Sequence, residues 1–98
     1  MWRHGDIIIA AIPAIPKGAR QRASTVLAKG ELTGHSHRIE DSETGRLWDH
    51  RTEMFLEVTA PSARLVHQEH KPITLPQGTY RCWFQREYTP ESIRRVID

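Results

Sequence analysis

Short runs of β-branched, leucine and aromatic residues recur about every ten residues along the chain, and this spacing limits the fold more than any other feature. Proline, glycine and small polar residues separate the runs, and no long stretch between them repeats its apolar residues with a helical period of about 3.6 residues. Short strands at regular spacing with turn residues between them are typical of all-β sandwiches and barrels. We therefore predict an all-β fold, a small antiparallel barrel or sandwich of about six to seven short strands.

The clearest strand signal is TEMFLEVTA at residues 52–60, in which Met54, Leu56 and Val58 alternate with mostly polar residues. Such alternation places one face of a strand in the core and the other in solvent. The β-branched run DIIIAAI at residues 6–12 indicates a buried strand. Further strands are predicted over residues 24–28, 31–40, 63–70, 73–75 and 79–88.

Prolines and polar residues predict the interruptions between these strands. Residues 13–24 are expected to form a loop or an edge, because their prolines lack backbone donors. Pro61-Ser62 and Pro76-Gln77-Gly78 are expected to break the chain into separate strands, and the polar segment 41–53 predicts a hairpin loop. Residues 89–98 predict a short C-terminal helix or a tail.

Composition narrows the class of protein. A length of 98 residues predicts a single β-rich domain over residues 1–98. The net charge of +2 is lower than that of a dedicated nucleic-acid-binding domain, and a lone cysteine, Cys82, excludes an intrachain disulfide or a thiolate metal cluster. The longest apolar run, residues 7–16, is too short to cross a membrane, and we expect no signal peptide. These features predict a cytoplasmic protein without a membrane partner.

Two histidine-rich motifs are the strongest functional signal, GHSH at residues 34–37 and VHQEH at residues 66–70. Residues two positions apart share one face of a strand, so the side chains of each motif can converge on one point if the two segments are neighbours. Imidazole and carboxylate ligands without thiolate suit Zn²⁺, Fe²⁺, Mn²⁺ or Ni²⁺. We therefore predict a small metal-binding protein with a divalent transition metal as cofactor. The predicted ligands are His35, His37, His67 and His70, with Glu69 as a ligand or catalytic base, whereas His4 and His50 are predicted to be surface residues.

The first motif resembles that of the cupin barrel family, in which a glycine is followed by His-x-His and then by a glutamate. Gly30, His35, His37 and Glu40 stand in this order, with spacings about one residue shorter. The resemblance implies a β-barrel in which both histidines bind a metal. A second cupin motif places a histidine shortly after Pro-x-Gly, and here the Pro-Gln-Gly sequence is followed by Arg81 at that position. One ligand of the family is therefore missing.

The same histidines permit a metal-independent alternative. Two imidazoles can cleave RNA when one deprotonates the 2′-hydroxyl group and the other protonates the leaving oxygen, while a cation stabilises the transition state. The predicted catalytic residues for this reaction are His37, His70 and Lys71, with Arg38 or Arg86 as other sources of the positive charge.

The last predicted strand interleaves aromatic and basic residues, which supports a hypothesis from a different class. Exposed aromatic rings can stack on unpaired bases while arginines contact phosphates. The chain would then be a non-catalytic RNA- or protein-binding subunit of a larger assembly, or a homo-oligomer. Its predicted contact residues are Arg81, Trp83, Arg86 and Tyr88, and residues 80, 82 and 84 on the other face are predicted to belong to the core.

Overall fold

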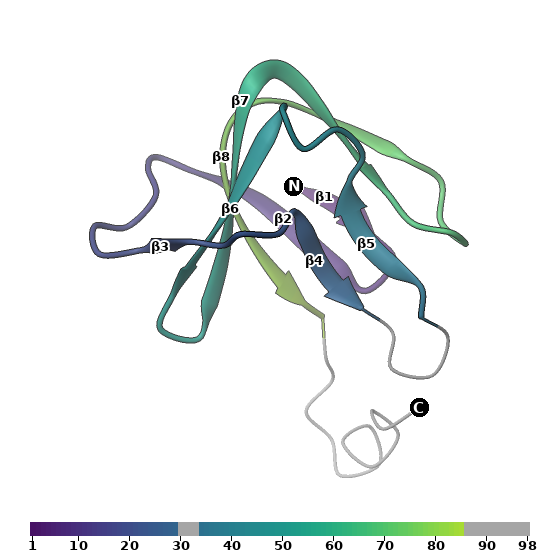
Figure 1. Cartoon of the computed structure of the whole chain (residues 1–98), viewed down its shortest axis with the longest axis horizontal. Coiled ribbons are helices and arrows are strands. Elements are labelled where there is room, and N and C mark those ends of the chain that lie inside the picture. Colours follow the sequence, from purple (N-terminus) through teal and green to yellow (C-terminus); the bar gives the residue numbers. More distant parts are fainter. Residues whose placement is uncertain (30–33, 86–98) are drawn as a thin grey trace, which may run out of the picture.

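The structure, a computed structural model, describes residues 1–29 and 34–85, which form one antiparallel sheet (Figure 1). No helix is present among these residues, so the all-β prediction is confirmed. The helix or tail expected over residues 89–98 lies outside the described residues. The eight strands are β1 (Trp2–His4), β2 (Ile7–Ile12), β3 (Arg20–Gln21), β4 (Val26–Lys29), β5 (Ser36–Ile39), β6 (Gly45–His50), β7 (Glu53–Val66) and β8 (Ile73–Phe84).

The strands follow the order β1-β2-β8-β7-β5-β4, and β6 pairs with β7 and with the short strand β3. One edge of β7 lies along β8, whereas its other edge is shared between two strands. β6 pairs with residues 53–58 of β7, and β5 pairs only with Leu65 and Val66. The sheet is compact but does not close into a barrel.

The two longest strands pass through the prolines that were predicted to end them. β7 continues through Pro61 and β8 through Pro76, and the two strands bend together (Figure 1). Their pairing register shifts at residues 58–62, which places extra residues of β7 opposite β8 and bends it without ending it. At the bend the hydroxyl of Tyr80 donates a hydrogen bond to the carbonyl oxygen of Pro76 at 2.5 Å. The predicted breaks at both prolines are therefore wrong, because a bulge and side-chain hydrogen bonds accommodate them.

Residues 45–50 form strand β6 where the sequence predicted a hairpin loop. Leu47 is fully buried, and a Cβ atom at Gly45 would lie only 3.2 Å from the carbonyl oxygen of Glu57 in the neighbouring strand. The turn after β6 contains Arg51, whose φ is +58°. The loop prediction is wrong because one buried leucine and a closely packed glycine fix this polar segment against β7.

A cluster of buried side chains forms the core. Tyr80 and Cys82 of β8 are each 2% exposed, which confirms that these two positions belong to the core. Burial raises the pKa of the Cys82 thiol to about 12, so this cysteine is an inert packing residue. The largest fully buried apolar side chains come from five strands and are Ile7, Ile9, Ile39, Leu47, Leu56, Leu65 and Leu75.

Bending of the sheet brings β1 beside β5, although three strands separate them in the sheet order (Figure 1). The Nδ1 atoms of His4 in β1 and His37 in β5 lie 2.9 Å apart. The backbone ladder of β1 runs to β2 instead, so side chains join the two sides of this seam. The fold thereby places histidines from distant strands at one point.

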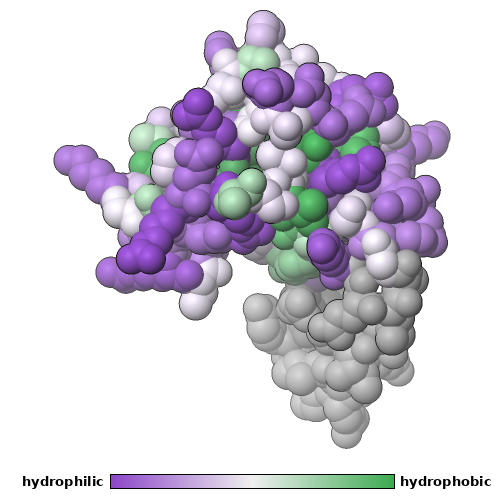
Figure 2. Space-filling model, viewed as in Figure 1, coloured by the Kyte–Doolittle hydropathy of each residue, from purple (hydrophilic) through white to green (hydrophobic). Residues whose placement is uncertain are grey.

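The surface of the described chain is mostly polar, and hydrophobic colouring is confined to small areas of the face in Figure 2. Met1 and Phe84 are its exposed large hydrophobic residues. The prediction that residue 84 belongs to the core is therefore wrong, because Phe84 lies at the end of β8, beyond the buried positions 80 and 82. The described residues contain no helix that is long and apolar enough to cross a membrane.

Candidate metal centre

Three histidines meet at the seam beside β1. His37 lies on β5, and His67 and His70 lie in the connection between β7 and β8. One nitrogen atom of each ring lies within 4.8 Å of the corresponding atoms of the other two. We call these residues the histidine triad. The structure thus brings together three of the four predicted ligands.

The triad runs from the interior to the surface. His37 is 9% exposed, His67 is half-buried and His70 is exposed. The ring centroid of His67 lies 4.4 Å from that of His37 and 4.6 Å from that of His70. A tetrahedral Zn²⁺ ion with Zn–N distances of about 2.0–2.1 Å needs ligand nitrogens about 3.3 Å apart. The rings therefore need to approach by up to about 1.5 Å to bind an ion, and the exposed His70 side chain has room to move.

His4 was predicted to be a surface residue, and this prediction is wrong. It is only 2% exposed, and both of its ring nitrogens have partners. Nδ1 lies 2.9 Å from Nδ1 of His37, and Nε2 lies 3.0 Å from the carbonyl oxygen of Lys71. A histidine can be buried in this way because each polar atom of its ring is satisfied.

Burial keeps the inner imidazoles neutral. It is the main reason why the pKa of His37 falls to about 4, and repulsion by His67, His4 and His70 lowers it further. Burial is also the leading cause that lowers the pKa of His4 and of His67. At neutral pH these rings therefore carry lone pairs, the form of histidine that binds metal ions.

His35 and Glu69 lie beside the triad without joining it. Nδ1 of His35 is 3.2 Å from a carboxylate oxygen of Glu69, and the rings of His35 and His67 are 5.6 Å apart. The backbone N–H of Glu69 donates a hydrogen bond to Nδ1 of His67 at 3.0 Å, so we assign the proton of neutral His67 to Nε2. A metal ion needs a nitrogen without a proton, so it binds Nδ1 directly or Nε2 after the proton has moved to Nδ1. Either route breaks the hydrogen bond from Glu69.

Gly5, in the turn between β1 and β2, lets the backbone pass close to the triad. Its φ of +62° is a conformation that other residues rarely adopt. A Cβ atom at this position would lie 2.7 Å from Nε2 of His70 and 3.1 Å from Cε1 of His37. Sequence reasoning missed both Gly5 and His4. A histidine followed by glycine directly before an apolar strand was the available signal, since it indicates a tight turn at the edge of the core.

Residues 3–85 match a protein family described as "Domain of unknown function (DUF8820)". The chain belongs to this family. The matched part of the DUF8820 domain includes His4, Gly5 and the whole histidine triad. Neither the curated proteins nor the solved structures contain a match to the chain.

The cupin resemblance does not extend to the structure of this DUF8820 domain. Its sheet is open, so the closed barrel that the resemblance implied is wrong. Glu40 forms an ion pair with Arg64 at 3.6 Å, and Arg81, at the position of the missing histidine, pairs with Glu53 at 2.8 Å. Gly30 lies outside the described residues. The likeness is therefore limited to the His-x-His sequence.

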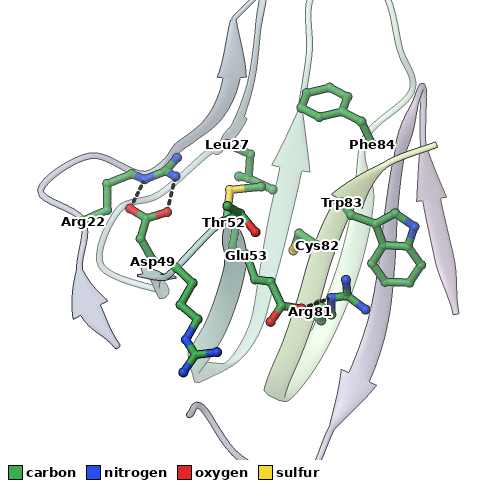
Figure 3. Close-up of a pocket in the computed structure, with 11 residues that line it drawn as sticks. Arg22, Leu27, Asp49, Thr52, Glu53, Arg81, Cys82, Trp83 and Phe84 are labelled. Atoms are coloured by element: carbon green, nitrogen blue, oxygen red, sulfur yellow. Dashed lines mark hydrogen bonds and ion pairs between the residues drawn. The ribbon is translucent and has the colours of Figure 1, made fainter. Parts of the chain in front are cut away.

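The strand with aromatic and basic residues borders a cleft of about 440 Å³ in the DUF8820 domain (Figure 3). We call it the arginine cleft. Two ion pairs stand at its walls, between Arg22 and Asp49 and between Arg81 and Glu53. The guanidinium group of Arg81 also lies 5.0 Å from the centroid of the Trp83 ring. The arginines of these two pairs thus have carboxylate partners within the chain.

The predicted RNA- or protein-binding residues are only partly described. Arg81 is engaged by a carboxylate and by an aromatic ring, and Trp83 is half-buried beside it. Arg86 and Tyr88 lie outside the described residues. The hypothesis of a binding subunit stays a prediction.

The residues of the metal-independent reaction lie next to one another. The rings of His37 and His70 are stacked, with centroids 5.5 Å apart and an interplanar angle of 16°. Lys71 contributes its backbone carbonyl to the cluster, where it contacts His4. A general acid or base must reach a proton of the substrate, and the burial of His37 restricts such access. The ribonuclease hypothesis stays a prediction.

Proposed function

We propose that this protein binds one divalent transition metal ion through His37, His67 and His70. The observation that carries the proposal is the approach of their ring nitrogens to within 4.8 Å of one another. The low pKa of His37 supports it, because a ring that stays neutral at pH 7 is ready to donate a lone pair.

Zn²⁺ suits this ligand set better than Fe²⁺, Mn²⁺ or Ni²⁺. Zinc binds neutral imidazoles in a tetrahedral arrangement, and three histidines with one open position are a ligand set of catalytic zinc sites. Carboxylate and carbonyl oxygens suit Mn²⁺, and non-haem Fe²⁺ sites commonly include one carboxylate. The triad contains only histidines in the described part of the chain, which favours zinc.

The fourth coordination position would determine the chemistry of such a site. Because His70 is exposed, water or a small anion can reach an ion from this side. A zinc ion held by the triad would supply an activated water for the hydrolysis of an ester or carbonyl compound. His35 and Glu69, which pair at 3.2 Å beside the triad, would be the candidates for a proton acceptor at such a site.

Elemental analysis of the purified protein and calorimetric titration of the EDTA-treated protein with Zn²⁺ test the proposal. We expect one ion per chain and loss of binding in His37→Ala. The matched control is His50→Ala, which removes a half-buried histidine of β6 that is not part of the triad. Co²⁺ binding should give the visible absorption of a tetrahedral site, and azide should change this spectrum by occupying the open position.

Two results would contradict the proposal. One is a purified protein that contains negligible metal and produces no heat of binding with Zn²⁺, Co²⁺ or Ni²⁺. The other is equal loss of affinity in His37→Ala and His50→Ala, which would mean that the metal binds histidines without regard to the fold.

A further inference from the structure

His4 makes contacts that fix where the protons of the neighbouring rings reside. Its Nε2 atom faces the carbonyl oxygen of Lys71 at 3.0 Å, and its Nδ1 atom faces Nδ1 of His37 at 2.9 Å. A carbonyl oxygen only accepts hydrogen bonds. Nε2 of His4 must therefore carry a proton and donate a hydrogen bond to the carbonyl oxygen of Lys71.

The direction of the second hydrogen bond follows from the first. A neutral imidazole carries one N–H group, so Nδ1 of His4 has only a lone pair and must accept. The donor is then Nδ1–H of His37. This assignment leaves the lone pair of neutral His37 on Nε2, the nitrogen that a metal ion would use.

A cationic His4 would reverse the second hydrogen bond, and its surroundings disfavour that state. The ring is 2% exposed and lies among His37, His67 and His70, whose ring centroids are 5.0, 6.4 and 5.7 Å away. No ion pair joins His4 to a carboxylate in the described residues. A positive charge here would be buried among other imidazoles without a carboxylate partner in the described residues.

We propose that His4 is a positioning residue that, through the relay from His37 to the Lys71 carbonyl, holds His37 in the Nδ1–H tautomer and presents its Nε2 lone pair. The tautomer belongs to the metal-free protein, whereas the consequence for metal affinity rests on the proposed function. Histidine ligands of metals commonly donate their second ring N–H to a carboxylate, a backbone carbonyl or a water, which fixes the ring and raises its basicity. The acceptor here is a second, buried histidine anchored on the backbone.

The tautomers can be measured directly. Long-range ¹H–¹⁵N correlation spectra of the metal-free protein distinguish ring nitrogens that carry a proton from those that carry a lone pair. We expect the Nδ1–H form for His37 and the Nε2–H form for His4. A His37 ring in the Nε2–H form would overturn the proposal, and this result does not depend on metal binding.

Two substitutions then test the effect on the site. His4→Gln keeps one donor and one acceptor, because its amide N–H can replace Nε2–H and its amide oxygen can replace Nδ1. His4→Leu fills the buried space but keeps neither. We expect the Kd for Zn²⁺ to rise by about 10–100-fold in His4→Leu and His4→Gln to restore most of the affinity, while circular dichroism shows the same fold for both.

The outcomes separate this proposal from the proposed function. Equal zinc affinity of the wild type, His4→Leu and His4→Gln would overturn the positioning role while leaving the metal site intact. A wild-type chain that binds no zinc would overturn the proposed function, and the tautomer spectra would still decide whether the relay exists. Loss of the Nδ1–H form of His37 in His4→Leu supports the relay in either case.

Discussion

The arginine cleft and the seam that holds His4 and the histidine triad differ in how their ionisable side chains are paired. In the cleft, Arg22 pairs with Asp49 and Arg81 pairs with Glu53, and a third arginine, Arg51, also lines the wall, so most of its charges face an opposite charge within the chain. At the seam the imidazoles face one another, and burial lowers the pKa of several of them. In the cleft, charged side chains mainly pair with each other. At the seam, the neutral rings carry lone pairs that suit a cation. The comparison agrees with the proposed metal site at the seam.

The largest expected effect that separates the two regions is stabilisation by zinc. A ligand that binds only the folded state, at a free concentration about 1,000 times its Kd, stabilises it by about 4 kcal/mol. We expect urea denaturation to show this gain for the wild type and for Arg81→Ala, but not for His67→Ala. An equal gain in all three proteins would remove the distinction between the cleft and the seam.

Acid should weaken the seam before it weakens the cleft. In the unfolded chain His37 has an ordinary pKa of about 6.5, and in the folded chain its pKa is about 4. The unfolded state therefore binds more protons in this interval, and the free energy of unfolding falls as the pH decreases from about 6.5 to 4, by about 3 kcal/mol from this residue. Denaturation of the metal-free protein at several pH values measures the loss.

The cleft loses stability in the same direction, as the pH falls, but only at lower pH. The hydrogen bond from Arg22 lowers the pKa of Asp49 below its usual 3.8, so this pair stabilises the fold above that pH and loses its effect only below it. We expect His37→Asn to flatten the stability profile between about pH 6.5 and 4, and Asp49→Asn to leave that interval unchanged. The reverse result would assign the acid sensitivity in this interval to the cleft and would contradict the prediction.

A substitution at Gly5 should have an intermediate effect. Gly5→Ala strains a backbone with a φ of +62°, which costs about 1–2 kcal/mol, and its Cβ pushes His70 away from the triad. The matched control is Gly18→Ala, because Gly18 has a φ of +87° but its added Cβ would approach nothing closer than 3.9 Å. Both variants should lose similar stability in thermal denaturation, and only Gly5→Ala should lose zinc affinity, by about tenfold. Equal zinc affinities would show that His70 adjusts without cost.

The smallest expected effect belongs to the cleft. Arg81→Ala removes an ion pair and a contact with Trp83, and both partners of the ion pair are partly exposed. Such interactions contribute less than about 1 kcal/mol. Urea denaturation should therefore show only a small decrease in the free energy of unfolding. A loss of several kcal/mol would show that the sheet depends on the contacts of Arg81 for its stability.

Local patterns predicted the strands β2, β4, β5 and most of β7 and β8, and the meeting of His37 with His67 and His70. The i and i+2 spacing of His35 and His37 required only the geometry of a strand. The long strands were harder to predict, because β7 and β8 continue through Pro61 and Pro76 with the help of a bulge in their pairing. A bulge depends on the partner strand, which the local sequence does not contain.

The environment of His4 could not be predicted for a related reason. Its two partners, His37 and Lys71, are 33 and 67 residues away in the chain. Nothing near His4 in the sequence indicates a carbonyl acceptor or a second imidazole. Its burial follows from the curvature of the whole sheet, which brings β1 to β5, and local patterns carry no information on that curvature.

The short pairing of β5 has a consequence for a bound ion. Among the described residues, the register of β5 against β7 consists of Arg38 and Ile39 opposite Val66 and Leu65, and the backbone N–H of Glu40 adds a hydrogen bond to the carbonyl oxygen of Arg64. An ion held by His37 on one side and by His67 and His70 on the other would therefore add a further link between β5 and the connection from β7 to β8.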